Sequence, residues 1–264
     1  TRKESSAASD VYKRQPFLAV VITMISGGIL FTILGENPFE AIRIIFWDPL
    51  FDPNFASYSR PQLLVKAGPL ILIAIGLSFG FKAGVWNIGA EGQYIMGAIF
   101  GAGLALAFYP MESKLIFPLM IIAGALGGFL WGMIPAFLKA KLNTNEILVS
   151  LMLVYVAESI LASVSQGLLK NPDGYGFPGS RNLQKYESAA NVEIISNSGM
   201  HWGVLFAFIT VIFSYIVLTR HIQGFNIQLT GEAPRAAKFA GVNPTANIVS
   251  VSYTHLTLPT TPYV

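Results

Sequence analysis

Long apolar runs, separated by polar connections, constrain the fold of this chain more than any other feature of its sequence. Runs at or near the length of a membrane span occupy residues 16–34, 115–138, 147–169 and 201–219. A helix needs about 20 apolar residues to cross the hydrocarbon core, and a spanning element must satisfy its own backbone polar groups. Only 12% of the residues are charged, against about 25% in soluble domains. The sequence therefore predicts an all-α polytopic integral membrane protein.

A further apolar region is interrupted in its middle by the polar, glycine-rich stretch GFKAGVWNIGAEGQYIMGA, residues 80–98. The apolar halves, 67–81 and 94–109, are short, because about 15 residues rise only about 22 Å as a helix. The hydrocarbon core is roughly 30 Å thick. Either the polar residues complete two tilted helices, or the chain breaks at membrane depth, beside protein or water. We expect about six transmembrane helices, the second and third meeting at a break or re-entrant region near 82–93.

The positions of lysine and arginine predict the orientation, because cytoplasmic loops are enriched in both. With the amino terminus inside, the inner connections hold Lys82, Lys139, Lys141, Arg220, Arg235 and Lys238. The outer loops would then be 35–62 and 170–200, and the second is rich in Pro, Gly and Asn, as an ordered external loop would be. We therefore predict a cytoplasmic amino terminus.

Glycines spaced four residues apart predict where helices pack closely. Gly97 and Gly101 form one such pair, and Gly124, Gly128 and Gly132 form a second series. Small residues at this spacing let helix backbones approach each other in lipid.

Both ends of the chain differ in composition from the rest. Residues 1–15, which include SSAASDVYKRQ, and residues 252–264, SYTHLTLPTTPYV, resemble translated sequencing-adapter peptides. We interpret both as non-native segments, to be kept out of fold reasoning. Residues 16–251 would then form the transmembrane domain, and the apolar run that starts near Ile248 would begin another span. On this interpretation the chain is truncated at its carboxyl end.

Two carboxylates lie within or beside the apolar regions. Glu91 belongs to the interrupted stretch, and Glu158 lies near the centre of the run 147–169. Ionisable groups inside a membrane are functional candidates, because a carboxylate there costs about 2.5–3.5 kcal/mol on insertion scales. We expect Glu158 to face the interior of the bundle, hydrogen-bonded or protonated. The alternative for Glu91, together with Lys82, is an ordinary solvated connection on the inner side.

The stretch KAKLNTNEILVSLML, residues 139–153, contains a helix start. Asn143 or Thr144 is expected to cap a helix that begins near Asn145. Glu146 would then lie in the first turn, where a negative charge is favourable.

The stretch TGEAPRAAKFAGVNP, residues 230–244, predicts a short helix on the inner face. Pro234 suits the first position of a helix, and Gly241 suits the position after its end. A short helix carrying two cations would serve either as a docking element for a partner or as a juxtamembrane helix held by anionic lipid.

Taken together, GVWNIGAEGQ, NEILVSLMLVYVA, DGYGFPGS (173–180) and GEAPRAAKFAGVNP resemble, in order, the motifs of permease subunits of ATP-binding-cassette importers for simple sugars and nucleosides. The resemblance covers roughly residues 16–249. It implies that the translocation route is bordered by Asn87, Gly89, Glu91, Gly92 and Gln93, to which we add Glu158 as a candidate. It also implies that the coupling loop 220–245 docks on a separate ATPase through Glu232, Arg235, Ala236, Ala237, Lys238 and Gly241.

The resemblance implies transport of a nucleoside or simple sugar across the bacterial cytoplasmic (inner) membrane by ATP-driven alternating access. The chain would be a transport subunit rather than an enzyme, without catalytic residues, metal ligands or a cofactor of its own. ATP and Mg²⁺ would bind the partner, since the sequence contains no phosphate-binding loop of the form Gly-x-x-x-x-Gly-Lys-Ser/Thr.

The implied partners are the ATPase subunits, a second permease that is identical or non-identical, an extracytoplasmic substrate-binding protein or lipoprotein, and the lipid bilayer. The net charge of +3 gives no indication of nucleic acid. The alternative is a proton-coupled secondary transporter in which Glu91 and Glu158 titrate.

Overall fold

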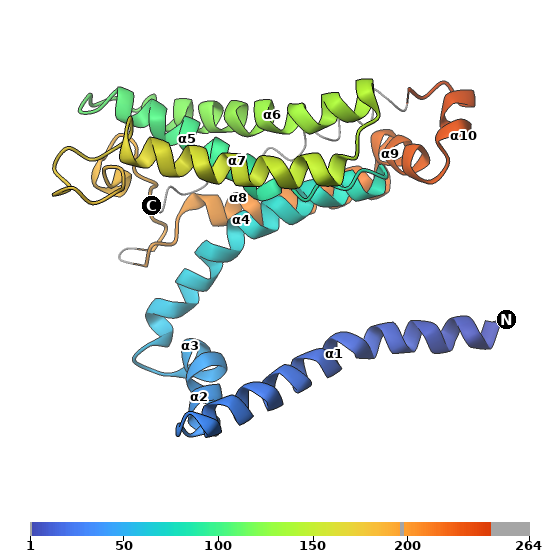
Figure 1. The fold of residues 1–264 in the computed structure, drawn as a ribbon, viewed down its shortest axis with the longest axis horizontal. Coiled ribbons are helices and arrows are strands. Elements are labelled where there is room, and N and C mark those ends of the chain that lie inside the picture. The colour runs from blue at the N-terminus through green and yellow to red at the C-terminus, as the bar shows by residue number, and fades with distance from the viewer. Residues whose placement is uncertain (1, 196–197, 244–264) are drawn as a thin grey trace. The chain divides into compact units, whose positions relative to one another are not determined.

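The computed structural model describes residues 2–195 and 198–243, and most of these residues are helical (Figure 1). Within them, β structure is limited to one isolated bridge between Glu193 and His201. The predicted all-α class is thus confirmed. The chain divides into two compact units, Thr1–Leu63 and Leu64–Val264, which are described separately. The predicted non-native segment 252–264 and the apolar run near Ile248 lie outside the described residues.

The first unit begins with α1, Arg2–Ile33, followed by the short helices α2, Pro38–Ile42, and α3, Asp48–Phe51, with a π-helical turn, Arg43–Trp47, between them. Residues 14–33 are long and apolar enough to cross a membrane. The segment predicted as the outer loop 35–62 is largely helical, because Asn37 caps α2 through its side chain and Arg43 pairs with Asp48 at 3.1 Å. The interpretation of residues 1–15 as non-native stays a prediction.

The second unit is a helical bundle joined to the first through α4, Ala56–Lys82. Its further elements are α5, Ala90–Ala107; α6, Ile116–Leu142; α7, Glu146–Gln166; η2, Leu183–Lys185; α8, Trp202–Arg220; α9, Ile222–Glu232; and α10, Pro234–Phe239.

Among the described residues, five helices are long and apolar enough to cross a membrane: the apolar part of α1, then α4, α6, α7 and α8. The remaining predicted span, the third along the chain, corresponds to α5, whose 18 residues rise about 27 Å. The expectation of a short second span was wrong, because α4 runs unbroken for 27 residues. The predicted apolar half begins only at residue 67 because Arg60 and Lys66 are charged, although both lie inside α4.

Glycine-mediated packing holds α5, α6 and α7 together. The glycines of both predicted series are buried. A Cβ at Gly128 would lie 3.1 Å from the carbonyl oxygen of Gln93, so α5 and α6 approach each other at backbone distance. Close approach of this kind replaces the hydrophobic drive that lipid does not provide between helices.

The segment 170–200, predicted as an ordered loop, packs over one end of α5 and α6. Leu183 and Tyr186 share a buried cluster with Ala105, Ile116 and Met120. The Tyr186 hydroxyl donates to the carbonyl oxygens of residues 108 and 111. These contacts order the described part of the loop, whose helical structure is limited to the short 3-10 helix η2.

Candidate functional site

The polar stretch between α4 and α5 forms a break that reaches into the bundle. Residues 83–89 are non-helical, and α5 starts at Ala90. A Cβ at Gly92 would lie 3.1 Å from Val154 Cα and 3.3 Å from Trp131 Nε1. Val154 is eight residues, about 12 Å, from the start of α7. The first turn of α5 therefore lies beside the middle of α7. The predicted break in the chain is confirmed, and its depth in the membrane stays a prediction.

Hydrogen bonds to the backbone fix the path of the break. The Asn87 side-chain oxygen accepts from Gly89 N–H at 2.8 Å. The Ser150 hydroxyl of α7 accepts from Ile88 N–H at 3.3 Å and donates to the carbonyl oxygen of Ile147 at 3.1 Å. Gly89 packs against the same serine, since a Cβ there would lie 2.8 Å from both Cβ and the carbonyl oxygen of Ser150. Asn87 and Gly89 thus shape the chain within this subunit.

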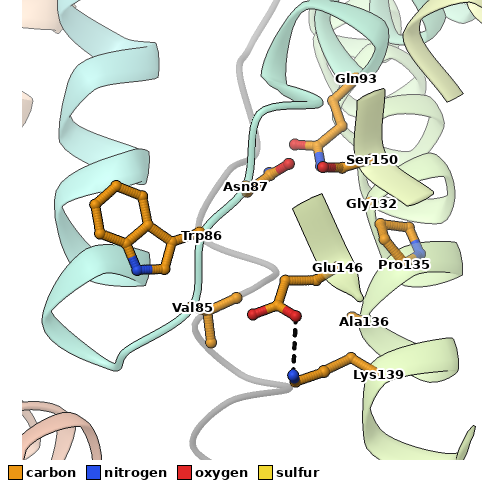
Figure 2. A pocket seen from close by; sticks show the side chains of 10 residues that line it. All are labelled: Val85, Trp86, Asn87, Gln93, Gly132, Pro135, Ala136, Lys139, Glu146 and Ser150. Atoms are coloured by element: carbon orange, nitrogen blue, oxygen red, sulfur yellow. Dashed lines mark ion pairs between the residues drawn. The ribbon is translucent and has the colours of Figure 1, made fainter. Parts of the chain in front are cut away.

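A small cavity with polar groups at both ends lies behind the break (Figure 2). It is lined by Val85, Trp86, Asn87, Gln93, Gly132, Pro135, Ala136, Lys139, Glu146 and Ser150. Figure 2 shows the polar groups of Asn87, Gln93 and Ser150 at one end and an ion pair at the other. The cavity measures about 20 Å³, which is room for one water molecule, since a water requires about 10–15 Å³ on this measure. It is far too small for a sugar or a nucleoside.

The ion pair joins the end of α6 to the start of α7. Lys139 Nζ lies 2.9 Å from a Glu146 carboxylate oxygen (Figure 2). The same carboxylate accepts a hydrogen bond from the Trp86 backbone, so it also ties down the break. Asn145 caps α7, accepting from the N–H groups of the next helical residues at 3.0 and 3.4 Å. The prediction of a cap at Asn143 or Thr144 was wrong, because Asn143 is left-handed, with φ of 50°, and ends α6.

A much larger groove opens between α4 and α5. Its lining residues are Val65, Lys66, Pro69, Leu70, Ile73, Glu91 and Tyr94. Its volume is about 610 Å³, within the roughly 300–1,000 Å³ of small-molecule sites. Glu91 is exposed in this groove, whereas Gly92 and Gln93 are buried on the other side of α5. The five predicted route residues therefore separate into one that lines the groove and four that belong to the packed side of the break.

Lys66 is the groove residue that sequence reasoning missed. It interrupts the apolar pattern of α4 and lies between the predicted outer loop 35–62 and the apolar half 67–81. The available signal was the apolar sequence on both sides of it, which continues the helix from Ala56 to Lys82.

Glu158 lies on the exposed side of α7. The buried side of that helix is formed by Ser150, Val154 and Ala157. The expectation that Glu158 faces the interior was therefore wrong for the described bundle, because one residue beyond Ala157 the helix has turned away from α5 and α6.

The predicted coupling segment consists of two helices rather than one. α9 was not predicted, whereas α10 matches the expected short helix starting at Pro234. Ala237 is fully buried, and Gly241 follows α10 with φ of 79°. Among the exposed side chains of the segment are Glu232, Arg235, Ala236, Lys238 and Phe239. Phe239, missed by sequence reasoning, is 95% exposed.

α9 connects this segment to the break. Ile227 shares a buried cluster with Phe79, Ala83 and Val85. A Cβ at Gly231 would lie 3.0 Å from the backbone of Ala83 and of Gly84, and Gly84 itself has φ of 75°. Backbone therefore meets backbone between the end of α9 and the start of the break. A displacement of α9 must displace the break or separate from it.

Comparison with known proteins gives this arrangement a context. Residues 60–253 match the family described as branched-chain amino acid transport system / permease component. The chain belongs to this permease family. The matched range runs through the break, α7 and the segment α9–α10. Membership and the apolar helices of the described residues identify the chain as part of a multi-pass membrane permease.

Curated relatives of the permease are similar over most of its length. It is 30% identical to the glucose ABC transporter permease protein TsgB13 of Haloferax volcanii, covering 86% of this chain and 60% of the relative. It is 28% identical to the nucleoside ABC transporter permease protein NupB of Lactococcus lactis, covering 89% and 65%. For the guanosine ABC transporter permease protein NupP of Bacillus subtilis the identity is 24%, covering 89% and 66%. The chain thus spans about three fifths to two thirds of these relatives. No solved structure matches it significantly.

Proposed function

We propose that the permease moves a nucleoside or a simple sugar across the cytoplasmic (inner) membrane of a bacterium, driven by ATP hydrolysis on a separate subunit. The names of the relatives support this substrate class, since they include glucose, nucleoside and guanosine permeases. The groove of about 610 Å³ beside the break is large enough for such solutes.

The observation that carries the proposal is the continuous contact from the exposed helix α10 through α9 to the break. α10 presents Arg235 and Lys238 outward while Ala237 anchors it. α9 in turn packs backbone against backbone on the first residues of the break through Gly231. Docking of an ATPase on α10 would therefore move the groove wall, as alternating access requires.

The charges at the helix ends support an inner location for α9 and α10, and hence a cytoplasmic amino terminus. α4, α6 and α8 each end with basic residues in the last turn, namely Lys82, then Lys139 and Lys141, then Arg220. Cytoplasmic ends carry such an excess, and cations also suit helix carboxyl ends.

The proposed assembly contains two permease subunits, identical or not, ATPase subunits that hold ATP and Mg²⁺, and an extracytoplasmic substrate-binding protein or lipoprotein. The permease itself binds no cofactor in this proposal. Its contribution is a path and a conformational change, since phosphoryl transfer is performed by positioning and electrostatics on the ATPase.

The test is uptake by the full-length permease, co-expressed with its neighbouring transport genes in a host that lacks nucleoside and glucose uptake. We expect accumulation of labelled guanosine or glucose that is lost when the phosphate-binding lysine of the ATPase is replaced. Uptake that survives this replacement and collapses with a protonophore would favour the proton-coupled alternative instead.

A further inference from the structure

We propose that Lys66 and Glu91 act as opposed charges across the groove between α4 and α5 and select an uncharged, polyhydroxylated solute. The inference rests on the proposed function and assigns the selectivity of the groove to two side chains. It gives Glu91 a role that Asn87 and Gln93 do not share, because these two residues line only the water-sized cavity.

The depth of Lys66 is the first observation. It lies 16 residues before the end of α4, about 24 Å along the helix. With the inner boundary near Lys82, this position falls within a hydrocarbon core of roughly 30 Å. Ionisable residues at such depth face a water-filled cavity or a partner and mark solute pathways. Lys66 has a cavity beside it, because it lines the groove.

The second observation is that both charges remain available to a ligand. Lys66 and Glu91 are exposed in the groove, and in the described part of the chain neither takes part in an ion pair. By contrast, the lysine and glutamate of the small cavity neutralise each other at 2.9 Å. The groove therefore presents one cation and one anion from two different helices, with a space of about 610 Å³ beside them.

Hydrogen-bond chemistry then indicates the ligand class. A lysine ammonium only donates, and an ionised carboxylate only accepts. A hydroxyl does both, so a sugar or ribose ring with several hydroxyls can satisfy the two groups at once. A phosphorylated solute would approach Lys66 favourably but would meet repulsion from Glu91. Opposed charges therefore disfavour solutes that carry a single sign of charge, and discrimination of this kind works partly by repulsion.

The remaining walls agree with this class. Val65, Leu70 and Ile73 provide apolar surface, and Tyr94 adds an aromatic ring one helical turn beyond Glu91. Apolar walls with a few convergent polar groups are typical of small-molecule sites. Such walls suit the carbon face of a sugar or a planar base.

The first experiment compares uptake by the full-length transporter carrying Lys66→Gln, Glu91→Gln or the exchange Lys66→Glu with Glu91→Lys. Lys114→Gln and Glu187→Gln serve as controls, because both residues are exposed and lie outside the groove. We expect each groove variant to raise the KM for guanosine at least tenfold, while the exchange recovers part of the loss. Glu91→Gln should also shift the ratio of guanosine monophosphate to guanosine uptake upward about tenfold.

Uptake at wild-type KM and with an unchanged phosphate ratio in both single variants would overturn the inference. A wild-type transporter that moves none of these solutes would instead overturn the proposed function. The two failures are thus distinguishable.

A second measurement does not depend on the activity of a variant. The printed chain contains no cysteine, so a single cysteine can report on water access once any cysteine elsewhere in the full-length chain is replaced by serine. Leu70→Cys lies in the groove wall, and Leu130→Cys replaces a leucine that is 53% exposed on α6. We expect a membrane-impermeant thiol reagent to label Leu70→Cys and not Leu130→Cys, with protection by guanosine. Equal absence of labelling would place the groove against lipid and overturn the inference.

Discussion

Replacing Gly89 by alanine tests whether the break is held in place by close packing against α7. Gly89 has φ of −88° and ψ of 15°, a conformation open to alanine, so backbone strain does not enter. The effect is purely steric. A Cβ would lie 2.8 Å from both Cβ and the carbonyl oxygen of Ser150. Ordinary contact begins at 3.4 Å, so the break and α7 must separate by about 0.6 Å, within the usual range of overpacking adjustments.

Overpacking of this kind costs about 1–3 kcal/mol, because the obstructing atoms belong to the backbone and to a Cβ rather than to a flexible side-chain end. Each kcal/mol lowers the unfolding midpoint by about 2–4 °C in a chain of 150–250 residues and by less in a longer one. We therefore expect Gly89→Ala to lower the midpoint by several degrees, at most about 12 °C. The assay is thermal unfolding of the full-length permease purified in detergent.

Gly103→Ala, also in α5, provides the matched control. Its Cβ would meet only Leu169 Cδ2, at 3.9 Å, and alanine favours a helix over glycine by about 0.8–1 kcal/mol. The control should melt at or above the wild-type temperature. If Gly89→Ala melts with the wild type, the packing argument for the break is refuted.

Three further predictions concern other parts of the molecule. Burial lowers the pKa of His201, and Glu193 opposes this shift to a smaller extent. As the pH falls below about 6.5, the unfolded chain therefore binds a proton at this histidine more readily than the folded chain does. The contribution of His201 to stability should therefore be fully present above that pH and be lost as the pH falls below it. Melting temperatures measured at several pH values should show this dependence in the wild type and not in His201→Asn. Asparagine keeps a side-chain acceptor for the start of the helix. Gly132→Ala would bring a Cβ within 2.9 Å of the Gln93 side-chain nitrogen, so unfolding of a double-mutant cycle with Gln93→Ala should give a coupling of about 0.5–3 kcal/mol; additive effects would contradict the contact. Phe239→Ala should weaken binding of the ATPase at least tenfold without changing the melting temperature, since aromatic anchors carry a large share of interface energy; an unchanged affinity would remove Phe239 from the docking surface.

The two cavities beside the break differ in size, and the predicted route residues are distributed between them. The polar one holds space for a single water, whereas the groove on the other side of α5 holds space for a solute. Gln93 is only 3% exposed, and its side chain packs against Gly132 of α6. Gln93 is therefore best understood as part of the packed side of the break.

Local pattern sufficed for most of the long helices, the break and the short helix at Pro234. Apolar length predicts a span because lipid offers the backbone no hydrogen bonds. Proline starts α10 because the first turn of a helix does not need its missing N–H group. Glycine follows the end of α10 because it tolerates positive φ. These are properties of a residue and its neighbours, and they can be read without knowing the fold.

The tertiary structure decided which side of each helix meets which neighbour. Glu91 and Gln93 are two residues apart, yet one lines the groove and the other is buried, because successive helical positions point in different directions. Lys66 became a candidate only when α4 proved continuous and its neighbour α5 proved to begin inside the bundle. Glu158 lies on the exposed side of α7 rather than in the interior, because the direction of a helical side chain depends on how the helix packs. The contact between Gly231 and the start of the break joins residues about 150 positions apart, and a sequence pattern of local period carries no information on such a pairing.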